Sequence, residues 1–220
     1  MESIINGFTS TFINENRYEL ILKGFGNTIC ISLVATVIGV FIGLIISIIQ
    51  YMQTTNRYLK PLSWFCNIYL VIIRGTPVVV QLMILYFSIF SNVKNAIPIA
   101  MLTFGINSGA YVSEIMRAGL QSIPKGQSEA GRSLGIIIIP QAIKNIIPAL
   151  FNEFITLVKE TSVAGYVAIP DLTKVMNGIY SRTYDASSLY FLAAIYLLVV
   201  VGLTLIQKYI ERRFARSDTH

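Results

Sequence analysis

The sequence predicts an all-α fold: a polytopic bundle of about five transmembrane helices. Two observations lead to this prediction. Of 220 residues, 54% are hydrophobic and only 13% are charged, whereas soluble domains carry about 25% charged residues. A soluble chain of this length could not cover so much apolar surface with so few polar residues. The second observation is a series of apolar runs between short polar turns, most of them long enough to cross a bilayer, which takes about 20 helical residues.

The predicted spans follow one another along the chain at residues 24–56, 62–90, 96–120, 150–169 and 186–207. The first contains no charged residue. The second is interrupted by Arg74-Gly75-Thr76-Pro77. Pro77 lacks a backbone donor and disfavours helix at the preceding residue, so we expect a kink or break there. The alternative is a plain proline kink with Arg74 extending to the membrane interface.

The distribution of basic residues predicts the orientation, because cytoplasmic loops carry an excess of Lys and Arg. With the C-terminus inside, ten of the 17 Lys and Arg residues lie inside, five lie outside, and Arg74 and Lys159 lie at membrane depth. We therefore expect an outer N-terminal segment (1–23), a transmembrane domain (24–207) and a basic cytoplasmic tail (208–220). No basic stripe interleaved with aromatics lies outside the apolar runs, so we expect no nucleic acid partner.

We expect no catalytic site, no metal site and no cofactor on this chain. It has no G-x-x-x-x-G-K-[ST] phosphate loop, no Ser/His/Asp or Cys/His set, and no metal-ligand spacing around its single histidine, His220. Cys30 and Cys66 lie in apolar runs and are expected to be buried small hydrophobes. If the chain moves a solute uphill, the energy must come from a partner or an ion gradient.

Polar residues inside the spans mark the expected pathway, since a charge at membrane depth costs several kcal/mol unless it is paired or hydrated. In the third span Asn107, Tyr111 and Glu114 are four and three residues apart and share one helix face. Glu114 could equally pair with Arg117 one turn later. A neighbouring ridge of small residues suits close helix packing; it consists of Gly105, Gly109 and Ser113.

The fourth span has a comparable polar face, in which Glu153, Thr156 and Glu160 recur at intervals of three and four. Two such faces indicate a hydrophilic path at the centre of the bundle. Carboxylate, amide and hydroxyl groups suit a small zwitterion or a cation. The residues expected to line the path are Arg74, Asn107, Ser108, Tyr111, Glu114 and Glu160.

The segment Glu129-Ala130-Gly131-x-x-x-Gly135, followed by Ile137-x-Ile139-Pro140, resembles the EAA loop of ABC importer permeases. Between about Lys23 and Arg213 an ordered set of further motifs is similar to the polar amino acid uptake subfamily. The set comprises Arg74-Gly75-Thr76-Pro77 with Gln81, Asn107 to Tyr111 with Glu114 and Arg117, Ile123 to Gln127, Pro140-Gln141-Ala142, Pro148-Ala149-Leu150, Asn152-Glu153-Phe154 and Lys159 to Ser162.

This resemblance implies a type I ABC importer permease fold in a multi-pass subunit of a bacterial cell membrane, surrounded by lipid. Two such permeases, identical or paralogous, form a dimer around one pathway. Separate ATPase subunits bind ATP and Mg²⁺, and an extracytoplasmic binding protein delivers the amino acid. The region of about 124–147 would be the cytoplasmic coupling loop. Its expected ATPase contacts are Glu129, Ala130, Gly131, Arg132 and Gly135.

The substrate expected from Glu160 is a cationic amino acid, arginine, lysine or histidine, with glutamine possible. An ion-gradient-driven secondary carrier that uses Glu114 or Glu160 is the alternative, and a non-transporting assembly subunit is another. The coupling segment departs from the family pattern at one point. Gly135 is followed almost at once by Ile137-x-Ile139-Pro140, where the family has more residues. Either a segment is absent from this sequence, which we favour, or the chain docks its ATPase differently.

Overall fold

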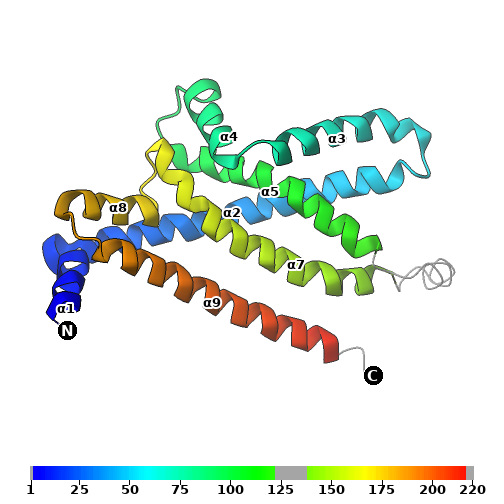
Figure 1. Cartoon of the computed structure of the whole chain (residues 1–220). Helices are drawn as coiled ribbons and strands as arrows, with labels where there is room; N and C mark the ends of the chain where they lie inside the picture. Colours follow the sequence, from blue (N-terminus) through cyan, green and yellow to red (C-terminus); the bar gives the residue numbers. More distant parts are fainter. Residues whose placement is uncertain (1, 122–137, 217–220) are drawn as a thin grey trace.

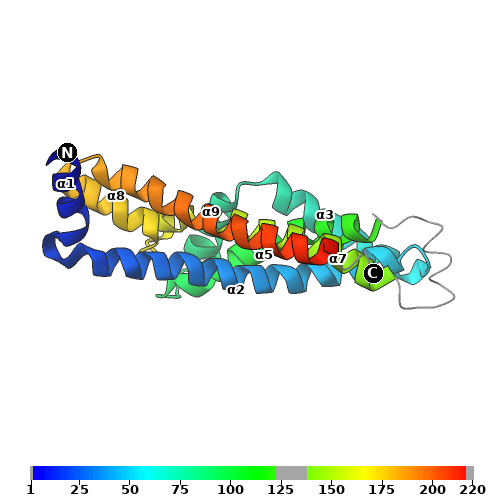
Figure 2. The ribbon, with the colours of Figure 1, turned by 90° about the horizontal axis from the view of Figure 1, so that it is seen from below.

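The structure, a computed structural model, describes residues 2–121 and 138–216. These residues are almost entirely helical, and no β-strand occurs among them, as the all-α prediction requires. Four long helices lie along one another (Figures 1 and 2): α2 (Arg17–Met52), α5 (Ala96–Gln121), α7 (Ile138–Glu160) and α9 (Ser187–Arg216). A fifth helix, α3 (Lys60–Gly75), contacts both α2 and α5.

The remaining elements are short. They are α1 (Glu2–Phe8), the π-helical turn η1 (Thr9–Ile13), the 3-10 turns η2 (Asn14–Asn16) and η3 (Arg57–Leu59), α4 (Val78–Ile84) with the π-helical turn η4 (Leu85–Ile89), the 3-10 segment η5 (Thr161–Val167) and α8 (Leu172–Thr183). Helices α1 and α8 lie at one end of the molecule. The start of α3 and the ends of α2, α5 and α9 lie at the other (Figure 1).

Three helical segments of the described chain are long and apolar enough to cross a membrane: Ile5–Met52, Ala96–Gln121 and Ser187–Phe214. The pair Arg57–Gly75 and Val78–Ile89, bent by 105°, would make a fourth span if counted as one. The prediction of five spans is therefore not confirmed. Helix α7 is long enough, but its sequence includes Glu153, Lys159 and Glu160, and it does not meet the same composition criterion.

The observed helix limits differ from the predicted spans in α2, in α7 and in α9, which continues to Arg216 beyond the predicted end at Gln207. Helix α2 begins at Arg17, seven residues before the predicted start at Gly24. Helix α7 begins at Ile138 rather than near Leu150, so Pro140 lies in its first turn, and Pro148 lies inside it. A proline is tolerated in the first turn because the N–H groups there have no partner within the helix. Helix α7 then ends at Glu160, and the chain continues as the 3-10 segment η5.

The break predicted between Arg74 and Pro77 is present. Helix α3 ends at Gly75, Thr76 is extended (φ −124°, ψ 142°), and α4 starts after Pro77. Between the two helices the chain turns by 105°. The break is sharper than a proline kink inside one continuous helix, which was the alternative interpretation.

Helices α2 and α5 form the most extensive contact between described elements. Glycines on both helices allow it. A Cβ atom on Gly43 would lie 2.5 Å from Val112 Cγ1, and one on Gly109 would lie 2.7 Å from Ile42 Cγ2. The two helices therefore approach more closely than side chains at these positions would permit. The close helix contact expected from the small-residue ridge of the third span is present at Gly105 and Gly109.

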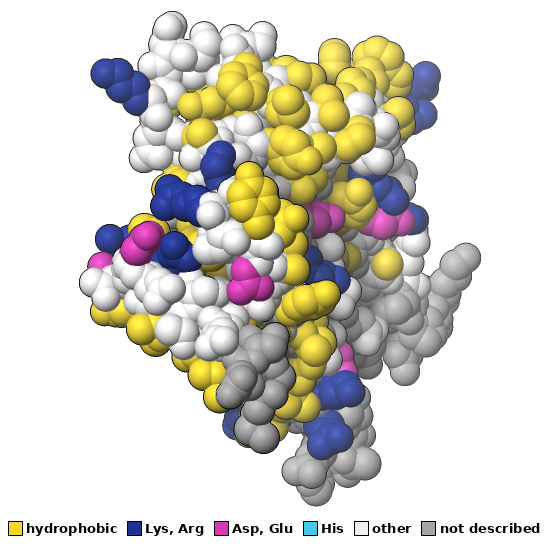
Figure 3. All heavy atoms as spheres, turned by 60° about the vertical axis from the view of Figure 1, so that its left-hand side comes forward, with side chains coloured by type: hydrophobic (Ala, Val, Ile, Leu, Met, Phe, Trp, Pro, Cys, Tyr) yellow, Lys and Arg dark blue, Asp and Glu magenta, His cyan; other side chains and the backbone are white. Residues whose placement is uncertain are grey.

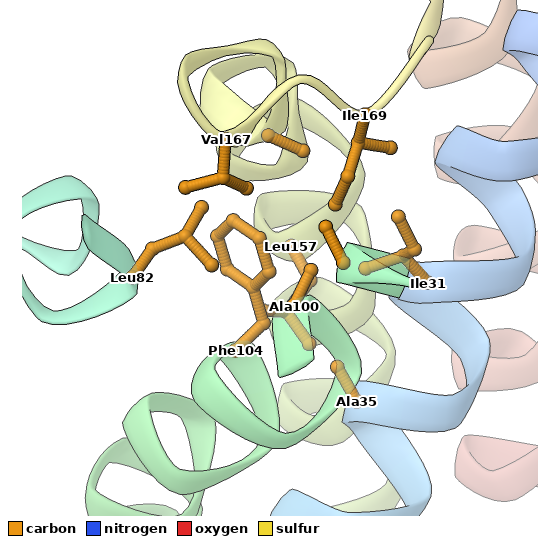
Figure 4. Close-up of a cluster of buried hydrophobic side chains, with 10 residues drawn as sticks. Ile31, Ala35, Leu82, Ala100, Phe104, Leu157, Val167 and Ile169 are labelled. Atoms are coloured by element: carbon orange, nitrogen blue, oxygen red, sulfur yellow. The ribbon is translucent and has the colours of Figure 1, made fainter. Parts of the chain in front are cut away.

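The main hydrophobic core lies where α2, α4, α5, α7 and η5 meet (Figure 4). Phe104 of α5 is fully buried at its centre. The other labelled side chains converge on it from the surrounding elements: Ile31, Ala35, Leu82, Ala100, Leu157, Val167 and Ile169. Because Leu82 belongs to α4, this cluster holds the bent segment after Pro77 against the bundle.

Two surface features complete the fold. Figure 3 brings the α1 and α8 end of the molecule forward, and charged side chains of both signs lie there beside hydrophobic surface.

The expectation that both cysteines are buried is wrong for Cys30, which is exposed on α2, and correct for Cys66. An apolar residue on the outside of a transmembrane helix meets lipid rather than water, so exposure there carries no penalty.

Candidate substrate pathway

The chain break after α3 creates a polar site, because Pro77 cannot donate to the carbonyl four residues earlier, that of Ile73. The side chain of Gln81 supplies the missing donor. Its Nε2 atom lies 2.9 Å from Ile73 O, 3.0 Å from Thr76 O and 2.9 Å from Thr76 Oγ1. Gln81 thus caps the end of α3 from one turn into α4.

A hollow of about 320 Å³ lies beside this break, between α5 and the end of α7. Ligand pockets in proteins are usually about 300–1,000 Å³. Its wall combines a cation, a carboxylate, an amide and a phenol with the backbone of the break. The lining residues are Arg74, Gly75, Thr76, Pro77, Val78, Asn107, Tyr111 and Glu160. Four of the six residues predicted to line the pathway therefore meet in one place: Arg74, Asn107, Tyr111 and Glu160.

A second hollow of about 440 Å³ shares Arg74, Gly75 and Tyr111 with the first and extends along α3 past Leu70 and Val71. The Arg74 guanidinium lies over the Tyr111 ring, 5.6 Å from its centroid. This cation–π geometry holds the guanidinium at the point where the two hollows meet.

The other two predicted residues lie outside the lining of the first hollow. Ser108 is fully buried and donates a hydrogen bond to Glu153 Oε1 at 2.8 Å, so it joins α5 to α7. Glu114 forms an ion pair with Arg117, whose Nε lies 3.1 Å from Glu114 Oε2. The pairing along α5 that was the alternative for Glu114 is therefore the arrangement observed.

The predicted ATPase contacts, Glu129, Ala130, Gly131, Arg132 and Gly135, lie outside the described residues, as does most of the predicted coupling loop. Residues 138–147 of that loop form the beginning of α7. Within residues 2–121 and 138–216, no three His, Cys, Asp or Glu side chains are grouped so that they could hold a metal ion.

Two polar residues at this site were not among the predicted pathway residues. Gln81 is 8% exposed and also contacts Asn107, whose Nδ2 lies 3.3 Å from Gln81 Oε1. Glu153 receives the hydrogen bond from Ser108. Gln81 was identified only as part of the family motif that follows Arg74, and Glu153 as a member of the polar face that contains Glu160; neither was predicted to line the pathway.

Residues 39–216 match the family described as "Binding-protein-dependent transport system inner membrane component". The match covers well over half of the chain. The chain belongs to this family. The membership among ABC importer permeases that the sequence motifs predicted is thereby confirmed, and the family is one of transport subunits rather than enzymes.

Similar proteins from bacteria support the assignment. The arginine transport system permease protein ArtQ of Bacillus subtilis (strain 168) is 35% identical over 214 residues, covering 92% of this chain and 95% of ArtQ. The L-cystine transport system permease protein TcyB of the same organism is 33% identical, covering 93% and 90%. The putative glutamine transport system permease protein GlnP of Rickettsia felis is 37% identical, covering 88% and 92%.

Solved structures share the fold. A chain of an amino acid ABC transporter crystallised with histidines superposes with a TM-score of 0.80 and 37% identity, covering 89% of this chain and 94% of that one. The inward-facing MetNI methionine ABC transporter superposes with a TM-score of 0.78 at 20% identity. The second likeness concerns the fold alone.

Proposed function

We propose that this chain is the permease subunit of an ATP-driven importer of polar or basic amino acids, and that the hollow beside the α3–α4 break belongs to its substrate path. The observation that carries the proposal is the presence of opposite charges in the lining of one hollow, with Arg74 from α3 and Glu160 from α7. A zwitterionic amino acid presents a carboxylate and an ammonium group, so each would find a partner of opposite charge there.

Among the candidate substrates we favour arginine, lysine and histidine, with glutamine possible. A second positive charge on the substrate would be favoured by Glu160, which lines the hollow. The relatives that support an amino acid substrate differ among themselves, since their names specify arginine, cystine and glutamine. An ion-gradient-driven carrier is not favoured, because the family is one of binding-protein-dependent systems.

In the assembly we propose, two permease chains, identical or paralogous, enclose the path. ATPase subunits dock beneath them through the Glu129–Gly135 segment and carry the ATP and Mg²⁺. An extracytoplasmic binding protein delivers the amino acid. We also propose that α7 crosses the membrane as a fifth span, with the N-terminus outside and the C-terminus inside. Helix α7 packs against α2, α5 and α9, which supports its placement within the bundle.

Reconstitution tests the transport mechanism. Liposomes that hold this chain with its ATPase subunits and its binding protein should accumulate labelled amino acid only when ATP is supplied. An ATPase variant unable to hydrolyse ATP should abolish uptake. Uptake by liposomes that contain this chain alone, abolished by an uncoupler, would instead establish the ion-gradient carrier.

The Glu160→Gln variant tests the substrate class. It keeps the size and hydrogen-bonding groups of the side chain but removes its negative charge. Arginine uptake should then fall about tenfold more than glutamine uptake, because both substrates lose the attraction of Glu160 for their α-ammonium group but only arginine also loses it for a second positive charge. Glu19→Gln, an exposed position on α2, is the matched control and should change neither. Equal losses of both substrates in Glu160→Gln would contradict a cationic preference.

A further inference from the structure

We propose that Gln81 is a positioning residue of the substrate path: it orients the Asn107 amide so that Asn107 offers a hydrogen-bond acceptor to the substrate. This inference rests on the proposed function, because it assigns a role within the same hollow. Gln81 does not line the hollow itself. It acts from behind the wall through two successive contacts.

The first contact sets the orientation of the Gln81 amide. Its terminal nitrogen is 2.9 Å from Ile73 O and 3.0 Å from Thr76 O. A backbone carbonyl can only accept a hydrogen bond, so the group that faces both must be the NH2 and not the oxygen. Gln81 Oε1 therefore points the other way. The two carbonyl acceptors at the break thus fix which of its two possible orientations the Gln81 amide adopts.

The second contact fixes the orientation of the Asn107 amide in turn. Its Nδ2 donates to Gln81 Oε1 over 3.3 Å. Because Oε1 can only accept, Asn107 must present its nitrogen to Gln81. Within the described residues Asn107 Oδ1 accepts no hydrogen bond. Asn107 borders the hollow, so its oxygen is the amide atom left for a ligand.

The result is a hollow with a defined pattern of donors and acceptors. Asn107 adds an acceptor to the negatively charged Glu160, while Arg74 supplies donors. The acceptor groups suit the ammonium or side-chain cation of the substrate, and the guanidinium suits its carboxylate. If Gln81 loses its amide, Asn107 is free to turn its NH2 group toward the substrate. The cationic group of the substrate would then face a hydrogen-bond donor instead of the Asn107 oxygen that accepts from it.

The test uses the assembled transporter with its ATPase subunits and binding protein in liposomes, and labelled arginine as the probe. Gln81→Met removes both contacts. The matched control is Gln50→Met, because Gln50 also donates to an asparagine, Asn67 Oδ1 at 3.0 Å, but at the contact of α2 with α3. We expect the maximal uptake rate to fall about tenfold in Gln81→Met and less than twofold in Gln50→Met.

Two comparisons separate positioning from a role in the fold. If Gln81 acts through Asn107, its effect should nearly vanish in the Asn107→Ala background, where Gln81→Met should cost less than a further twofold. The second variant is Gln81→Lys, whose ammonium can still donate to Ile73 O and Thr76 O but cannot accept from Asn107. It should lose uptake like Gln81→Met, with rates expressed per assembled complex.

The outcomes of these experiments distinguish a failure of the proposed function from a failure of the positioning role of Gln81. If the wild-type complex shows no ATP-dependent uptake, the proposed function fails. If it imports arginine but Gln81→Met behaves like Gln50→Met, the positioning role is overturned. The same holds if the losses from Gln81→Met and Asn107→Ala multiply. Failure of both Gln81 variants to assemble would also overturn it, because Gln81 would then serve the fold and not the path.

Discussion

At the scale of single residues, two aspartates cap helices under opposite electrostatic conditions. Asp171 begins α8 with a fully buried side chain that accepts hydrogen bonds from the backbone N–H groups of Thr173 and Lys174 at 3.2 and 3.1 Å. Burial raises the pKa of Asp171 from 3.8 to about 6, against the lowering effect of those N–H groups. The backbone N–H of Ser187 lowers the pKa of Asp185, which precedes α9.

These shifts predict pH dependences of opposite sign. A raised pKa means that the folded state binds the proton more tightly, so the contribution of Asp171 is complete below about pH 4 and is lost as pH rises through about 6. Asp171→Asn, which keeps an acceptor but cannot ionise, should raise the melting temperature at pH 7.5 and have less effect at pH 5. Asp171→Ala removes the cap and should cost about 1 kcal/mol.

Asp185→Asn is the matched comparison. The lowered pKa of the Asp185 carboxyl means that its ionised form stabilises the folded state at pH values above the unfolded pKa. This stabilisation is lost as pH falls through the folded pKa. The variant should therefore lower the melting temperature at pH 7.5. Thermal unfolding of the purified protein in detergent measures all three variants. Equal responses of Asp171→Asn and Asp185→Asn at pH 7.5 would refute the assigned directions.

At the scale of helices, the α2–α5 contact predicts opposite effects of one substitution at two glycines of α2. A Cβ atom on Gly43 would approach Val112 Cβ to 2.7 Å and the backbone nitrogen of Ser113 to 2.8 Å. Backbone cannot rotate away, so Gly43→Ala should push the helices apart and cost about 1–3 kcal/mol. Gly26 has nothing within 4 Å of its added Cβ, so Gly26→Ala should stabilise the helix by up to about 1 kcal/mol.

Melting temperatures of the two alanine variants check this prediction. Both variants gain the same helix propensity, so their difference isolates the close contact between α2 and α5. A Gly43→Ala variant as stable as Gly26→Ala would mean that the two helices are further apart than the structure has them.

Helix breaks and ends could be predicted from the sequence where a neighbouring residue causes them, but not where a tertiary contact does. The break after Gly75 was predictable because Pro77 itself removes a donor and restricts Thr76. The end of α7 at Glu160 was not, since no breaker stands there. Thr161, the first residue of η5, is fully buried, and its Oγ1 atom lies 3.3 Å from Oγ of Ser32 on α2. Such a contact between residues 129 positions apart leaves no local pattern.

At the scale of the whole molecule, the same distinction applies to the candidate site. Asn107 and Tyr111 were predictable because helical spacing puts them on one face, and Arg74 and Glu160 because charges at membrane depth need a function or a partner. Gln81 was not predicted as a pathway residue, because Pro77 shows that the Ile73 carbonyl lacks its backbone donor but not which side chain replaces it, and the 105° turn of the chain brings Gln81 there. The helix–helix arrangement then brings Gln81 to Asn107, 26 residues away.

The alternation of the helices also predicts where two surface positions lie relative to the membrane. Asn177 is exposed on α8, and Arg57 is exposed in η3 at the opposite end of the molecule (Figure 1). The excess of basic residues at the η3 end and the C-terminal tail predicts that this end is cytoplasmic. Single cysteines at these positions, in a Cys30→Ser/Cys66→Ser background, make the prediction measurable with a membrane-impermeant maleimide.

In intact cells Asn177→Cys should be labelled and Arg57→Cys should not, while permeabilised cells should label both. The cysteine-free background is the control and should stay unlabelled throughout. The reverse pattern would place the C-terminus outside and would put the Glu129–Gly135 segment on the wrong side for a cytoplasmic ATPase. Labelling of both positions in intact cells would mean that the two ends of the bundle do not lie on opposite sides of the membrane, which the path through it requires.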